Sequence, residues 1–232
     1  MEVSFGNAST HGKMASLNIG YKESVHVLHP NQIVGFLGKS EQREDSLMKL
    51  PSMFRKRRFI QSRLHGPATV MLGLPEGYNI TIVPVGAEDD LLYEFRHVLF
   101  YTDGVTFTSH LQNVKNTLIT QDLVKMMFKG PGSLGLLTTG PLYPMDLDVE
   151  NPLFVDMSCL VAYPRNAKLR LCVYGNTLAS QHMNYQWEMT GHGQVLLQPC
   201  KPDRKLDEHM KSDSLFRRVA REVIPFGGIF IK

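Results

Sequence analysis

Two short apolar blocks alternate along the chain and give the first indication of its fold. One block consists of two aliphatic residues, a spacer and an aromatic residue, and it occurs at 33–36, 98–101 and 160–163. The other has a glycine at its second position and runs into a strand-like apolar segment, at 65–72, at 129–136 and more loosely at 190–197. Two unlike blocks that share a period of about 62 residues predict an internal repeat.

Between these blocks, most segments alternate apolar and polar residues with a period of two, which is typical of β-strands. The segment 79–85 (NITIVPV) is one example, and 14–34 contains shorter ones. The tripeptides at 75–77 (PEG) and 102–104 (TDG) are turn signals. The polar segment 38–52 indicates a loop or a single helical turn. The pattern therefore predicts an all-β body.

Two segments depart from this pattern. Residues 116–128 fit either a helical face or a strand, and the parallel with 59–65 favours a strand in their second half. Residues 212–224 (SDSLFRRVAREVI) place apolar side chains on one helical face, with capping residues before them and Pro225 just after them. They predict one C-terminal helix.

The repeat predicts a single domain at 14–232 after a flexible N-terminus at 1–13. We expect three β-sandwich or double-stranded β-helix modules around a pseudo-threefold axis. Their cores are expected at about 14–64, 65–128 and 129–189, with 190–232 completing the ring. Because the strands before Phe36 have no glycine block ahead of them, we expect them to complete the last module. The remaining sheet edges and the apolar tail favour a homo-oligomer, such as a trimer.

Composition limits the class of protein. The chain has 232 residues, of which 43% are hydrophobic and 20% charged, and its net charge is only +3. These values are typical of a globular protein, and the sequence has no apolar run that predicts a membrane span. Three widely spaced cysteines and an N-terminus without signal-peptide features predict a cytoplasmic protein without disulfide bonds.

Candidate catalytic and metal-binding patterns are weak. His26 and His29 are three residues apart, which places them on opposite faces of a strand, so no metal site is expected. The glycine blocks enter strands instead of helices, which favours tight turns or close backbone approach between units over a phosphate-binding loop. The carboxylates of Asp89, Asp90 and Glu94 are interpreted as a solvated face. We expect no cofactor and no catalytic residues.

One basic run is a candidate binding site. Arg55, Lys56, Arg57 and Arg58 lie between two phenylalanines, and Arg63 follows them. Consecutive cations can contact phosphates while an aromatic ring stacks on a base. The alternative is an exposed, solubilising segment.

The repeated blocks resemble the altered-inheritance-of-mitochondria family, which also has bacterial members. The segment 130–132 (GPG) matches a strand entry of that family, and 22–25 (KESV) matches a family turn in part. His97 and Cys159 stand where the family has a glycine. The resemblance covers roughly residues 14–200. It implies repeated modules like the tryptophan-RNA-binding attenuation protein, and it carries over no activity.

These observations predict a non-enzymatic, oligomeric scaffold or binding protein. The alternative is an RNA- or anion-binding module that uses residues 55–58.

Overall fold

The chain folds as an assembly of antiparallel β-sheets. The computed structural model describes residues 2–5, 13–48, 59–111, 124–173 and 185–199, which fall within one compact unit, Met1–Pro202. The only helices among these residues are short 3-10 turns: η1 (Pro30–Gln32), η2 (Ser40–Gln42), η4 (Phe95–His97) and η5 (Met157–Cys159). The all-β prediction is confirmed. The helix expected at 212–224 lies outside the described residues.

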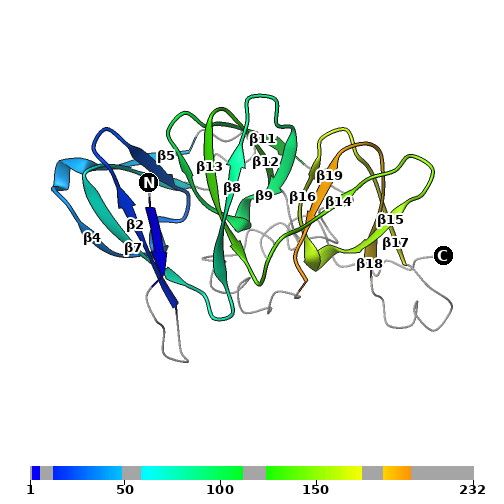
Figure 1. Cartoon of the computed structure of the whole chain (residues 1–232), viewed down its shortest axis with the longest axis horizontal. Helices are drawn as coiled ribbons and strands as arrows, with labels where there is room; N and C mark the ends of the chain where they lie inside the picture. Colours follow the sequence, from blue (N-terminus) through cyan, green and yellow to red (C-terminus); the bar gives the residue numbers. More distant parts are fainter. Residues whose placement is uncertain (1, 6–12, 49–58, 112–123, 174–184, 200–232) are drawn as a thin grey trace, which may run out of the picture. The chain divides into compact units, whose positions relative to one another are not determined.

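The first strands form one sheet and half of the next (Figure 1). They are β1 (Glu2–Phe5), β2 (Lys13–Ile19), β3 (Ser24–Val27), β4 (Ile33–Leu37), β5 (Arg43–Leu47), β6 (Ile60–His65) and β7 (Ala68–Leu74). The first sheet has the order β1-β2-β7-β4. The second sheet has the order β5-β6-β3-β10-β13-β8.

The later strands complete the second sheet and form two more. They are β8 (Asn79–Val85), β9 (Leu91–Glu94), β10 (Val98–Thr102), β11 (Thr106–Leu111), β12 (Val124–Lys129), β13 (Gly132–Thr138), β14 (Tyr143–Asp146), β15 (Leu153–Asp156), β16 (Leu160–Pro164), β17 (Lys168–Val173), β18 (Tyr185–Thr190) and β19 (Gln194–Leu197). The third sheet has the order β11-β12-β9-β16-β19-β14 and the fourth has the order β15-β18-β17. The strand predicted in the second half of 116–128 is β12.

One pairing scheme occurs three times along the chain. Strands β2 to β7 form the groups β2-β7-β4 and β5-β6-β3. Strands β8 to β13 form β8-β13-β10 and β11-β12-β9, and strands β14 to β19 form β14-β19-β16 and β17-β18-β15. We call these three sets of six strands the first, second and third modules. Their superposition around a threefold axis stays a prediction.

Two strand pairs join the modules. Strand β3 of the first module pairs with β10 of the second, with His26 opposite Tyr101. Strand β9 of the second module pairs with β16 of the third, with Leu92 opposite Tyr163. These pairs make continuous six-stranded sheets out of three-stranded groups. One core cluster contains buried residues of the second and third modules, including Tyr101, Phe128 and Val161.

The glycine blocks enter the last strand of each module. The N–H groups of Gly66, Gly130 and Gly191 donate to the carbonyls of Glu23, Gly86 and Asp148 at 3.0, 3.1 and 3.2 Å. All three carbonyls lie between the first and second strands of their module. A Cβ on Gly66 would lie 1.9 Å from the carbonyl oxygen of Gly20, and one on Gly130 would lie 2.1 Å from that of Gly104. Close backbone approach is therefore present at Gly66 and Gly130, but it occurs within modules and not between them as expected.

Two expectations about the first module are wrong. Residues 38–52 contain strand β5 as well as the turn η2, because β5 pairs with β6 although its exposed sequence (REDSL) has no apolar alternation. The strands before Phe36 do not complete the last module. Strands β2 and β4 pair with β7, and β3 pairs with β6 and β10. The turns predicted at 75–77 and 102–104 are confirmed by backbone hydrogen bonds.

A large residue faces a small one where the third strand of each module pairs with the sixth. Just after an irregularity in register, Gly35 lies opposite Met71, Phe100 opposite Gly135, and Ala162 opposite Leu196. A Cβ on Gly135 would lie 2.2 Å from the Phe100 ring. The buried ring of Phe100 thus fills the space that a side chain at 135 would need.

We expect Gly135→Ala to destabilise the fold, by about 1–3 kcal/mol as is usual for an overpacked core. The matched control is Gly86→Ala, where the added Cβ meets its nearest atom at an ordinary 3.4 Å. Urea unfolding of both variants measures the difference. Combining Gly135→Ala with Phe100→Ala should cost less than the sum of the single changes, because the ring no longer clashes. Simple additivity would contradict the proposed packing.

Candidate functional site

Arg63 is the one cation of the predicted basic site that the described residues include. It lies on β6, and its Nη2 donates to both carboxylate oxygens of Asp103 at 3.2 Å. Asp103 also contacts Nε2 of His26 at 3.2 Å, and the His26 ring stacks on Tyr101 at 4.6 Å. The chain's own carboxylate therefore engages Arg63 across the junction of the first two modules. Arg55, Lys56, Arg57 and Arg58 lie outside the described residues, so their role stays a prediction.

The histidines of β3 and its flank have separate surroundings. His26 faces Asp103, whereas the Nε2 of His29 donates to the carbonyl of Phe95 at 3.3 Å. Within the part of the chain that the structure describes, no group of three or more histidine, cysteine, aspartate or glutamate side chains is placed to hold a metal ion.

A buried ionic cluster lies in the second module. Glu94, at the end of β9, accepts a hydrogen bond from Lys125 Nζ at 2.7 Å and one from Arg96 Nε at 2.9 Å. Lys125 lies directly opposite Glu94 on β12. His97 donates through Nδ1 to the carbonyl of Leu137 on β13 at 2.9 Å. These contacts link both sheets of the module through the turn η4.

Burial and charge oppose each other at Glu94. Burial by itself would raise the pKa of this carboxyl, but Lys125 and Arg96 outweigh it and hold the pKa well below its usual range. Glu94 is 4% exposed, so its interpretation as part of a solvated acidic face is wrong. Sequence analysis did not predict this cluster because Lys125, the cross-strand partner of Glu94, lies on a strand that is distant in the sequence.

His97 is neutral in this surrounding. Burial, and then the charge of Arg96, lower the pKa of His97 to about 4. Its Nε2 lies 3.6 Å from a Glu94 oxygen and makes no hydrogen bond within the described part of the chain. A carboxylate already engaged by two cations and a neutral histidine of low pKa are poor proton carriers near pH 7. The cluster therefore acts as a structural tie.

The apolar block at 33–36 differs from its two counterparts in exposure. In β10, the residues Val98, Leu99 and Phe100 are fully buried, and in β16 Leu160 and Val161 are 1% and 0% exposed. In β4, by contrast, Val34 is 60% exposed and Leu37 is 72% exposed. The difference arises because β10 and β16 each pair with a strand of the preceding module, whereas β4 lies at the end of its sheet.

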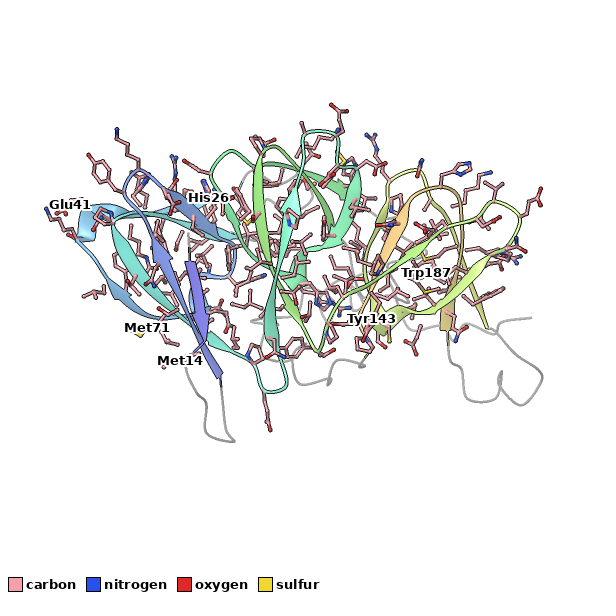
Figure 2. All side chains as sticks on the ribbon, in the orientation of Figure 1. Met14, His26, Glu41, Met71, Tyr143 and Trp187 are labelled. Carbon is pink, nitrogen blue, oxygen red and sulfur yellow. The ribbon has the colours of Figure 1, made fainter. Side chains whose placement is uncertain are left out.

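More apolar surface lies beside β4. Met14 on β2 and Met71 on β7 are 51% and 37% exposed, and Figure 2 shows both side chains on this part of the molecule. Strand β15 lies at the end of the fourth sheet, with Phe154 36% exposed. The candidate site is thus a pair of sheet ends, which we call the β4 edge (33–37) and the β15 edge (153–156).

The fold and these sheet ends define an all-β protein of linked antiparallel sheets with apolar strands at its ends. The chain belongs to the family described as mitochondrial biogenesis AIM24, whose model matches residues 9–200. The fold is similar to the crystal structure of protein SPYM3_0169 from Streptococcus pyogenes, with a TM-score of 0.59 and 15% identity over 95% of this chain and 100% of that one. No curated protein matches. Among the described residues, no helix is long and apolar enough to cross a membrane.

We expect His97 to make the stability of the fold depend on pH. Because its pKa is lower in the folded chain than the usual 6.5, the unfolded chain binds the proton first. The free energy of unfolding should therefore fall as pH drops from about 6.5 to about 4, by up to about 1.4 kcal/mol per pH unit from this group. Urea unfolding at several pH values measures the slope.

The variant His97→Gln should flatten this dependence, and His192→Gln, which changes an exposed side chain, serves as the control. His29 has the same sign of shift, so part of the slope should remain. A slope that His97→Gln leaves unchanged would show that this histidine is not buried in its neutral form.

Proposed function

We propose that this chain is a non-enzymatic scaffold or binding protein that acts as a homo-oligomer. The observation that carries the proposal is the exposure of the β4 edge. The same sequence block is buried wherever another module pairs with it, and it is exposed only where the sheet ends. An exposed apolar edge strand invites pairing with another chain, and natural proteins protect such edges unless they use them.

The chemistry of the edge supports association. Strand β4 (IVGFL) contains no charged residue and no proline, which are the usual protection of an edge strand. Met14 and Met71 add adaptable apolar area next to it. The buried ionic cluster supports a rigid framework instead of a reaction centre, because Lys125 and Arg96 both engage the Glu94 carboxylate.

Several finer expectations remain part of this proposal. They are a trimeric state, a cytoplasmic location, bacterial membership and a likeness to the tryptophan-RNA-binding attenuation protein. The family description names mitochondrial biogenesis, which is a cellular role without a stated reaction. A scaffold fits such a role.

Nucleic-acid binding through residues 55–58 is the second candidate. The basic run in the sequence favours it, whereas the engagement of Arg63 by Asp103 weakens it. If RNA binds, fluorescence anisotropy with mixed RNA should detect an affinity that falls steeply with salt. Changing residues 55–58 to alanine should then abolish it.

The molar mass in solution tests the leading proposal. Light scattering at micromolar concentration should give a multiple of the 26.2 kDa chain mass. The double variant Val34→Lys, Leu37→Lys should give a monomer, because charged residues on the edge oppose strand pairing. Tyr21→Lys, which changes a residue 77% exposed in a turn, is the control and should keep the oligomer. A monomeric intact chain would refute the proposal.

A further inference from the structure

The third strand of each later module uses its outer side to pair with the module before it. In β10, the carbonyl of Leu99 accepts from the N–H of Leu28 at 2.9 Å, and the N–H of Asp103 donates to the carbonyl of Ser24 at 3.1 Å. Tyr101 lies midway between these two contacts. Hydrogen-bonded positions alternate along an antiparallel pair, so the outer backbone groups of β10 are those of Leu99, Tyr101 and Asp103.

Strand β16 repeats this arrangement. Tyr163 lies opposite Leu92, and two residues further on the N–H of Arg165 donates to the carbonyl of Asp90 at 3.0 Å. The aromatic residue of the repeated block is thus the central outward-facing position in both internal junctions.

Strand β4 has the same inner pairing as β10. Phe36 lies opposite Val70 and Tyr101 lies opposite Leu134, and each partner is four residues past the leading glycine of its block. The irregularity in register also falls at the same place in both strands. The outer backbone groups of β4 are therefore those of Phe36 and of the residues two positions before and after it. No described strand pairs with them.

The other described sheet ends are poor partners for β4. They are the strands β1, β5, β8, β11, β14, β15 and β17. Six of these seven contain a charged residue or a proline, and β11 (TFTSHL) contains a histidine and three hydroxyl residues. Charge and proline are the usual protection of an edge strand. Among the described sheet ends, the apolar β4 (IVGFL) is therefore matched best by another β4.

Resting on the proposed homo-oligomer, we propose that the β4 edge pairs antiparallel with the β4 edge of a second copy, about a twofold axis at Phe36. Such a pair of identical strands is self-complementary, because the twofold axis brings each outer N–H to the matching carbonyl. The contact uses the segment 34–38, as the first internal junction uses 99–103. It continues the sheet β1-β2-β7-β4 into its copy, just as the internal junctions continue sheets between modules.

The aromatic residue at the centre of this junction has an internal precedent. The axis places Phe36 directly opposite Phe36 of the second copy. At the equivalent place in the first internal junction, the His26 ring stacks on Tyr101 with centroids 4.6 Å apart. Aromatic pairs directly across two antiparallel strands are among the stabilising combinations.

The flanking pairs are complementary in size. Leu37 lies opposite Gly35 of the second copy, and Val34 lies opposite Gly38, so each large side chain meets a glycine. A Cβ on Gly35 would lie 2.7 Å from the methyl carbon of Met71, so this methionine covers Gly35 on the exposed face of the sheet. Leu37 of the second copy would pack beside it. The pairing therefore covers Leu37 and Val34, which are 72% and 60% exposed.

Disulfide trapping tests the axis. In a full-length background with Cys159, Cys172 and Cys200 changed to serine, the single variant Phe36→Cys places two cysteines directly opposite each other. Their Cα atoms should be about 5.5 Å apart, which suits a disulfide. Mild oxidation should convert most of the chain to a linked dimer, and a reductant should reverse this. Adding Val34→Lys to the same chain should abolish the link.

A second variant leaves the Phe36 ring in place. Leu37→Cys changes an exposed side chain, and the two copies of this residue are diagonal neighbours across the axis, about 7–8 Å apart. A bismaleimide with a span of about 8 Å should therefore link Leu37→Cys into dimers. Leu47→Cys on β5, where the side chain is 56% exposed, is the matched control and should stay unlinked.

The outcomes separate this junction from the proposed oligomer. One twofold contact gives a dimer, so light scattering should give twice the 26.2 kDa chain mass, in place of the trimer expected from the sequence. An oligomer that neither cysteine variant links, a trimer included, would overturn the junction and leave the oligomer. A monomeric intact chain would overturn both.

Discussion

Backbone pairing between neighbouring modules is the constraint on which the rest of the structure depends. Pairing β3 with β10 and β9 with β16 joins three-stranded groups into continuous six-stranded sheets. The burial of the apolar block in β10 and β16 follows from these contacts. So does the position of the Arg63–Asp103 ion pair, which spans the first junction.

The second module has junctions on both sides, and it also holds the buried charges. Glu94, Lys125, Arg96 and His97 tie its two sheets together through hydrogen bonds that leave little freedom of register. At the place of Glu94, the first module has the buried apolar residue Leu28. The net contribution of a buried ionic network to stability is small, since desolvation offsets much of its attraction.

Sequence patterns predicted the parts of the fold that depend on local chemistry. The glycine blocks, the two tripeptide turns and the all-β class follow from residue types whose backbone preferences act over a few positions. Strand β5 was missed because a strand with solvent on both faces has no apolar alternation. The pairing of the strands before Phe36 was wrong because pairing depends on contacts between distant segments, which one sequence does not specify. The ionic cluster was missed for the same reason, and the exposure of β4 depends on which strands end a sheet.

The order in which the strands are synthesised has a consequence for folding of the nascent chain. Strand β3 leaves the ribosome well before β10, and β9 leaves well before β16. The sheet that begins in one module is therefore completed only after the next module has been synthesised. Native contacts between distant segments form slowly, and waiting strands are exposed to incorrect pairing meanwhile. A nascent chain of this kind carries an unfinished sheet at its growing end at every stage. It gains from chaperones that cover such a sheet until the next module arrives.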